Sequence, residues 1–188
     1  CPELFQRITA CLCIFATKMR NQFFNITTEH FNHLPEPPVR PYKNVAHLIP
    51  VHLIAHRGRS EAGHPDNTLT AFTAALDEGA DMVECDVRRL ADGELVCFHD
   101  ATIAGQLLSS LSHPELESLA GFAVPRLEEL AQLCRECDAG LDLELKERNC
   151  AVDALIAVDG LADLWIKSFH DDIVREVLAV QPNAHAGL

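Results

Sequence analysis

After residue 50, short apolar runs alternate with amphipathic segments, and this alternation restricts the fold more than any other feature of the sequence. The apolar runs end in polar or turn residues, as buried strands do, and the segments between them repeat apolar residues at helical spacing. Strands that alternate with helices favour a parallel sheet covered by helices, and therefore an α/β fold. The predicted strands are residues 51–55, 81–87, 94–100, 140–146, 163–169 and 183–188, and the predicted helices are residues 67–79, 125–137, 150–158 and 171–180.

The first 50 residues differ in composition from the remainder of the chain. They carry a net charge of +2, whereas residues 51–188 carry −15, and residues 34–43 contain four prolines. The apolar stretch from Ile8 to Ala16 is too short to span a bilayer, so no transmembrane segment is expected. We predict an N-terminal extension or linker of unknown role over residues 1–50 and one domain over residues 51–188.

Charge and cysteine content limit the partners and the cellular compartment. With 15 Lys and Arg against 28 Asp and Glu, the net charge of −13 argues against a protein that coats nucleic acid or an anionic membrane. The eight cysteines are too sparse for a disulfide-stapled domain, and Cys134 and Cys137 lie in a predicted helix without the second pair that a zinc site needs. We predict free thiols and a cytoplasmic protein, with secretion as the alternative.

Ionisable residues follow five of the predicted strands at their carboxyl ends. Parallel α/β folds and (β/α)8 barrels place their active sites at this edge of the sheet. Five such groups in succession predict a functional site rather than scattered surface charges. They are His56-Arg57-Gly58, Glu84-Cys85-Asp86, His99-Asp100, Glu144-Leu145-Lys146 and Lys167-Ser168-Phe169.

Three of these residues are candidate metal ligands. Glu84 and Asp86 are two apart on one strand and share a face, and Glu144 is expected to meet them across the site. Three carboxylates without an excess of Cys or His suit one hard cation, Mg²⁺ or Ca²⁺, rather than zinc. The alternative interpretation is that each acid pairs with an Arg or a Lys.

Four further residues point to phosphate-ester chemistry. His56 and His99 are candidates for proton transfer, because imidazole gains and loses its proton near neutral pH. Arg57 and Lys146 add fixed positive charge beside the candidate metal site. Such charge suits the negative charge that develops on a phosphoryl group in its transition state.

An ordered series of motifs resembles the glycerophosphodiester phosphodiesterase family. The series covers residues 51–188 and reads HRG, HPDNTLTAF, GADMVECDV, DGELVCFHD, LDLELK and IKSF. The resemblance implies a TIM-type (β/α)8 barrel with one divalent cation, which hydrolyses small-molecule glycerophosphodiesters to glycerol 3-phosphate and an alcohol. It also implies an acid/base pair of His56 and His99, phosphate contacts from Arg57 and Lys146, and a cation held by Glu84, Asp86 and Glu144.

The chain departs from the family pattern at three places. The family's P-E-N-T is Pro65-Asp66-Asn67-Thr68 here, so the acid is one methylene shorter, although Asn67 and Thr68 can still cap the next helix. The stretch 101–125 is shorter than the substrate-covering insertion of many members. The chain ends near the sixth predicted strand, so we expect an incomplete barrel of about six of the eight strand–helix units. The secondary site residues are Asp66, Asn67 and Ser168.

Two other functions are compatible with the sequence. One is a phospholipase-D-like enzyme that acts on intact lipids, although no apolar membrane-facing loop is seen after residue 51. The other is a non-catalytic metal-binding fragment. The sequence leaves open the released alcohol, the choice between Mg²⁺ and Ca²⁺, the division of acid and base roles between the histidines, and the oligomeric state.

Overall fold

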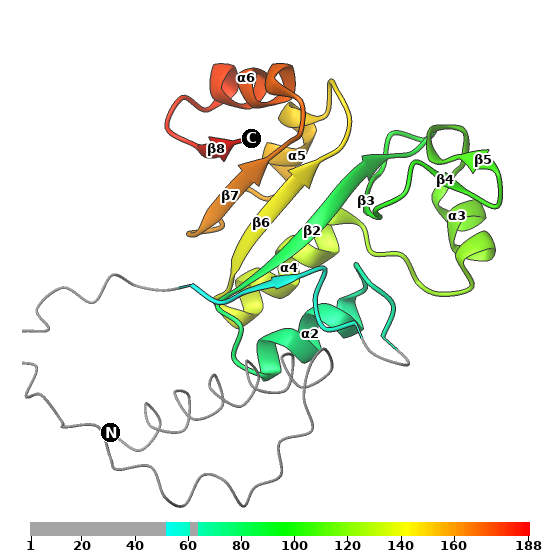
Figure 1. Cartoon of the computed structure of the whole chain (residues 1–188), viewed down its shortest axis with the longest axis horizontal. Helices are drawn as coiled ribbons and strands as arrows, with labels where there is room; N and C mark the ends of the chain where they lie inside the picture. Colours follow the sequence, from blue (N-terminus) through cyan, green and yellow to red (C-terminus); the bar gives the residue numbers. More distant parts are fainter. Residues whose placement is uncertain (1–51, 61–63) are drawn as a thin grey trace, which may run out of the picture. The chain divides into compact units, whose positions relative to one another are not determined.

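Six strands form one sheet in the computed structural model, which describes residues 52–60 and 64–188 of the chain (Figure 1). Five of these strands run parallel, in the order β1-β2-β6-β7-β8. The predicted α/β class with a parallel sheet is confirmed. The bounds of the five strands are Ile54–His56 (β1), Met82–Arg89 (β2), Gly140–Leu145 (β6), Leu164–Lys167 (β7) and His185–Gly187 (β8).

The strand predicted over residues 94–100 is present, but its direction corrects the prediction. The strand β3 (Leu95–Cys97) runs antiparallel to β2, with its Cys97 opposite Val87. Gly93, at a φ of 90°, lies in the tight turn between the two strands, and so short a connection permits only an antiparallel return. The described sheet therefore holds five parallel strands, one fewer than the strand–helix units that the sequence suggests.

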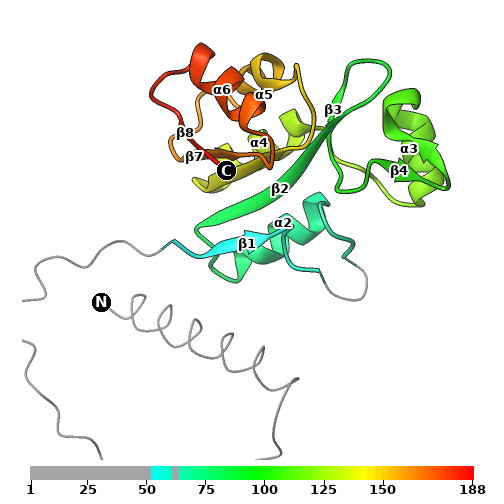
Figure 2. The same ribbon diagram turned by 45° about the horizontal axis from the view of Figure 1, so that its top comes forward.

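Four helices lie where the sequence predicts them, and all four pack on the same face of the sheet (Figure 2). Their apolar side chains meet alternate residues of the central strands, among them the fully buried Leu141 and Leu143 of β6. Removing this apolar surface from water is the main favourable contribution to folding. The helices are α2 (Leu69–Asp77), α4 (Leu127–Cys137), α5 (Ala151–Ala157) and α6 (Asp171–Val180).

The opposite face of the sheet is polar, because successive side chains of a strand point to opposite sides. Glu84 and Asp86 of β2 and Asp142 and Glu144 of β6 are all buried on this face. In the parallel register Glu84 lies beside Asp142, and Asp86 lies beside Glu144. Four carboxylates are thus brought together at the centre of the sheet.

A small lobe between β3 and α4 has no counterpart among the elements predicted from the sequence. It contains a hairpin of β4 (Thr102–Ile103) and β5 (Gln106–Leu107), a 3-10 turn η2 (Leu108–Ser110) and the helix α3 (His113–Ala120). Figure 1 shows α3 and the hairpin apart from the four helices that cover the sheet. The lobe has an apolar cluster of its own, formed by Leu90, Val96, Leu108, Leu116 and Val124.

The predicted extension over residues 1–50, with its proline-rich segment and three cysteines, lies outside the described residues. The five cysteines of the described part are free thiols, as predicted. Burial raises the pKa of Cys134 to about 12 and that of Cys150 to about 11, so both stay protonated at neutral pH.

Neither a membrane span nor pairing between the end strands is seen within residues 52–60 and 64–188. No helix of this part is long and apolar enough to cross a bilayer. The sheet runs from β1 to β8, and these two strands do not pair with each other there.

The turn that follows β1 is tightly packed against α2, and a substitution of Gly58 tests this packing. Its φ is 78°, and a Cβ atom at this position would lie 2.6 Å from the backbone carbonyl carbon of Ala71. We expect Gly58→Ala to lower the free energy of unfolding by about 3 kcal/mol, because steric overlap adds to the cost of a left-handed residue with a side chain. Urea unfolding followed by circular dichroism measures the change.

Gly93→Ala is the matched control for this measurement. Gly93 also has a positive φ, of 90°, but a Cβ atom there would meet no heavy atom within 4 Å. We therefore expect a loss of about 1 kcal/mol, from the backbone conformation alone. Equal losses in the two variants would contradict a packing role for Gly58.

Candidate active site

The turn after β1 carries His56 and Arg57, the first two predicted site residues. Arg57 has a positive φ of 58°, and its backbone N–H lies 3.0 Å from the carbonyl oxygen of Glu84 and 3.1 Å from the Glu84 carboxylate. These contacts hold the turn against β2. The His56 ring is exposed, with Nε2 3.8 Å from Glu84 Oε2. A non-glycine residue in the left-handed region is uncommon, and such strain often occurs at functional sites.

The three predicted metal ligands, Glu84, Asp86 and Glu144, lie together. One carboxylate oxygen from each lies within 4.8 Å of the others, and all three residues are buried. The pairing with Arg and Lys that the sequence analysis weighed as an alternative is present as well. The cluster therefore combines an oxygen set that could hold a metal ion with positively charged side chains at its margin.

Asp86 is surrounded by three side chains that favour its ionised form. Arg57 Nε lies 2.9 Å from its Oδ2, Asn67 Nδ2 donates to the same oxygen at 2.9 Å, and Lys146 Nζ lies 2.9 Å from its Oδ1. Burial by itself would raise the pKa of Asp86, but hydrogen bonds from Lys146 and Asn67, with the charges of Lys146 and Arg57, lower the pKa overall. Asp86 is therefore an anion at neutral pH.

The pKa of Glu84 shifts in the opposite direction. Burial raises the pKa of Glu84, the nearby charge of Lys167 opposes this rise, and the charge of Asp86 adds to it. Lys167 Nζ lies 3.2 Å from Glu84 Oε1. Glu84 is thus less well stabilised as an anion than Asp86.

Two buried oxygens of the cluster have no hydrogen bond of good geometry. They are Glu84 Oε1 and Asp86 Oδ1, and each is ion-paired instead, with Lys167 Nζ at 3.2 Å and with Lys146 Nζ at 2.9 Å. A buried polar atom without a hydrogen-bond partner is rare in folded proteins and is explained when an ion or water takes up its lone pairs. These poorly satisfied oxygens, together with the all-carboxylate donor set, fit a hard divalent cation.

Lys146 lies between two of the three carboxylates, since its Nζ pairs with both Asp86 and Glu144. The same ammonium group lies 5.7 Å from the centre of the Phe169 ring, which is 83% exposed. Arg57 and Lys146, the predicted phosphate contacts, are therefore both brought to the carboxylate cluster by the fold.

The antiparallel course of β3 returns the chain to the level of the carboxylates before it reaches His99. The N–H of Phe98 donates to the carbonyl oxygen of Asp86 at 2.9 Å. His99 Nδ1 lies 2.7 Å from Asp100 Oδ1, and Arg88 Nε donates to the His99 carbonyl oxygen at 2.8 Å. Among the described residues the ring's partner is Asp100, so the structure does not pair His99 with the three clustered carboxylates.

Asn67, a secondary site residue in the sequence analysis, is joined to Asp86 by two hydrogen bonds. In addition to donating from Nδ2, its Oδ1 accepts from the backbone N–H of Asp86 at 3.2 Å. Of the two residues predicted to cap the next helix, Thr68 does so, because its Oγ1 accepts from the N–H of Ala71 at 3.2 Å. Asn67 thus orients a carboxylate, and only its neighbour is a helix cap.

The other two secondary residues lie farther from the three carboxylates. Asp66 is exposed, with Oδ2 3.8 Å from Arg57 Nη1, so the shorter acid still lies beside the arginine. Ser168 is buried, and its Oγ donates to the carbonyl oxygen of Leu145 at 2.8 Å and accepts from the N–H of His170 at 3.2 Å. Ser168 therefore joins the ends of β6 and β7.

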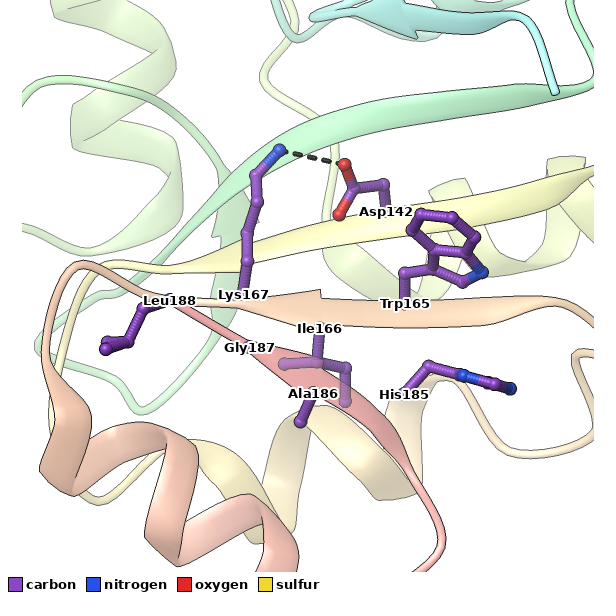
Figure 3. A pocket seen from close by; sticks show the side chains of 8 residues that line it. All are labelled: Asp142, Trp165, Ile166, Lys167, His185, Ala186, Gly187 and Leu188. Atoms are coloured by element: carbon purple, nitrogen blue, oxygen red, sulfur yellow. Dashed lines mark hydrogen bonds and ion pairs between the residues drawn. The ribbon is translucent and has the colours of Figure 1, made fainter. Parts of the chain in front are cut away.

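Two charged residues at the site are not among the predicted site residues, although Lys167 lies in one of the five groups at the strand ends. Lys167 Nζ donates to Asp142 Oδ2 at 2.8 Å, and Figure 3 shows this bond at the edge of a cavity of about 380 Å³. Trp165 and His185 line the same cavity. A signal for Asp142 is present in the motif LDLELK, because the alternation that puts Glu144 on the polar face puts Asp142 there too.

Comparisons with known proteins agree with this arrangement. A family model described as the glycerophosphoryl diester phosphodiesterase family matches residues 56–177. The probable glycerophosphodiester phosphodiesterase 1 of Mycobacterium tuberculosis is 49% identical over 73 residues, which cover 36% of this chain and 26% of the relative. The glycerophosphodiester phosphodiesterase of Caldanaerobacter subterraneus subsp. tengcongensis is 28% identical over 159 residues, which cover 72% of this chain and 65% of the relative. The chain thus spans less than two thirds of either relative.

Solved structures have the same α/β fold, that of TIM-type barrel enzymes. The glycerophosphodiester phosphodiesterase of Thermotoga maritima matches with a TM-score of 0.64 at 29% identity, covering 73% of this chain and 61% of that chain. A phosphodiesterase of Oleispira antarctica, solved in complex with the product sn-glycerol-3-phosphate, matches with a TM-score of 0.63 at 26% identity, covering 73% of this chain and 65% of that chain. The family match includes all three clustered carboxylates, and the chain belongs to the glycerophosphoryl diester phosphodiesterase family.

Proposed function

We propose that this protein hydrolyses glycerophosphodiesters to glycerol 3-phosphate and an alcohol, with the help of one divalent cation. The observation that carries the proposal is the group of three buried carboxylates within 4.8 Å of one another, with Arg57 and Lys146 beside them. Family membership supports the reaction class. The related phosphodiesterase that was solved with sn-glycerol-3-phosphate supports the glycerol phosphate part of the substrate.

The cation site would consist of Glu84, Asp86 and Glu144, whose oxygens suit Mg²⁺ or Ca²⁺. When bound, the cation would neutralise negative charge on the phosphate and make the phosphorus more open to attack. Arg57 and Lys146 would bind the phosphate oxygens with the N–H groups that the carboxylates leave free. Asn67 would hold the Asp86 carboxylate in one orientation through its pair of hydrogen bonds.

His56 and His99 would move the protons. One imidazole accepts a proton from water, or from the glycerol hydroxyl next to the phosphate, as that oxygen forms its bond to phosphorus. The other donates a proton to the oxygen of the leaving alcohol as its bond to phosphorus breaks. Attack by water gives glycerol 3-phosphate directly. Attack by the glycerol hydroxyl gives a cyclic phosphate, which a water would then open in a second step, with the two imidazoles in exchanged roles. Asp100, 2.7 Å from His99 Nδ1, would orient that ring and leave Nε2 for the transfer.

Removal of the cation tests the carboxylate cluster. We expect the 188-residue chain to release glycerol 3-phosphate from glycerophosphocholine with Mg²⁺ or Ca²⁺ and to lose this activity in EDTA. Glu144→Gln should bind the cation at least tenfold more weakly, because the amide that replaces the carboxylate carries no charge. Glu128→Gln, a change of an exposed glutamate at the start of α4, is the matched control and should leave binding and turnover unchanged. Undiminished turnover in EDTA would contradict the proposal.

Replacement of His99 tests the acid/base pair. We expect His99→Ala to lower kcat/KM for glycerophosphocholine by about 10²- to 10⁴-fold, the usual contribution of a general acid or base. Cation binding, followed by calorimetry, should not change, because the His99 ring is paired with Asp100 rather than with the carboxylates. His185→Ala, which removes an exposed imidazole on β8, is the control. If both variants turn over substrate at the wild-type rate, His99 is not part of the catalytic pair.

A further inference from the structure

Lys167 and Asp142 form an ion pair at the margin of the carboxylate cluster, and the proposed reaction uses neither. In the register between β6 and β7, Lys167 is level with Glu144, while Asp142 is level with Trp165. The Lys167 side chain nevertheless extends to Asp142, where Nζ donates a hydrogen bond of 2.8 Å (Figure 3). The Lys167 ammonium group therefore lies beside the residue two positions before its register partner Glu144 on β6.

The same ammonium group is also ion-paired with Glu84, at a longer distance than its hydrogen bond to Asp142. Lys167 Nζ is 3.2 Å from Glu84 Oε1, yet this oxygen is buried and has no hydrogen bond of good geometry. The hydrogen bond goes to Asp142. Lys167 thus places its positive charge 3.2 Å from Glu84 Oε1, and a cation that binds this oxygen has to displace the ammonium group.

We propose that this pair sets the affinity of the cation site, with Lys167 as a competitor for Glu84 and Asp142 as the positioning residue that draws the ammonium group away from Glu84. The inference rests on the proposed cation site. A divalent cation on Glu84 repels the ammonium group, and Asp142 offers that group a partner, so no lysine is left buried without a counter-charge. Without Asp142, the nearest carboxylate to Lys167 is Glu84, and the ammonium group would take the lone pair that the cation needs.

Isothermal titration of the 188-residue chain with CaCl₂ and with MgCl₂ tests the proposal. We expect Lys167→Met to bind the cation about tenfold more tightly, because the competitor is gone. Asp142→Asn should bind about tenfold more weakly, because Lys167 then moves onto Glu84. The double variant should bind as tightly as Lys167→Met, because Asp142 has no ammonium group left to position.

The double variant separates positioning from a simple effect of charge. If Asp142 acted only as a distant negative charge, or as a further ligand, Asp142→Asn would weaken binding by the same factor with Lys167 present or absent. That result would overturn the proposal. Arg88→Gln is the charge-matched control, because Arg88 lies on the same strand face as Asp86 but pairs with Glu147 at 3.0 Å. Equal tightening in Arg88→Gln and Lys167→Met would also overturn it.

A second variant and the wild-type titration distinguish an unfolded variant, the absence of a cation site, and a failure of the roles proposed for Lys167 and Asp142. Lys167→Gln removes the charge but retains an amide that can donate to Asp142, so it replaces Lys167→Met if a thermal melt shows that Lys167→Met is unfolded. The same tightening is expected of it. A wild-type chain that binds neither Ca²⁺ nor Mg²⁺ would overturn the cation site itself. A wild-type chain that binds, with variants of unchanged affinity, would overturn only the roles of Lys167 and Asp142.

Discussion

The burial of four carboxylates on one face of a parallel sheet is the constraint on which the rest of the structure depends. Buried charges are tolerated only when they are paired and hydrogen-bonded, because removing them from water is costly. Arg57, Lys146 and Lys167 provide three fixed positive charges close to this group. They come from the turn after β1, the end of β6 and the end of β7, so three separate connections have to converge on one point. The site therefore forms only when these three connections are ordered.

The two faces of the sheet have different roles, since one stabilises the fold and the other carries the charged site. One face is apolar and packs against four helices, and it supplies the stabilisation that permits polar residues to be buried on the other. On the polar face, Asn67, Arg57 and Lys146 hold Asp86 and lower its pKa, whereas burial and the charge of Asp86 raise the pKa of Glu84. We therefore expect Asp86 to be the more firmly held ligand of the proposed cation site, and Glu84 to be the ligand whose charge depends more on nearby groups.

Much of the arrangement follows from patterns within single segments. Period-two alternation places Glu84 and Asp86 on one face of β2, and helical spacing locates α2, α4, α5 and α6. The direction of β3 is less visible, because an apolar run reads the same for a parallel and an antiparallel strand, and only the short turn at Gly93 distinguishes them. The lobe around α3 escapes the sequence analysis because its hairpin strands are two residues long, too short to show periodicity.

The sequence by itself determined the fold class, the face on which each strand residue lies, and the strand ends at which the charged groups gather, because these depend on local periodicity. Only the tertiary structure decided which charges pair. Lys167 and Asp142 are 25 residues apart, and their contact depends on the register of β6 against β7 and on the direction of a long flexible side chain. The pairing of His99 with Asp100, rather than with the carboxylates, likewise depends on how the chain leaves β3. Register and side-chain direction arise from contacts between segments, and no single segment carries that information.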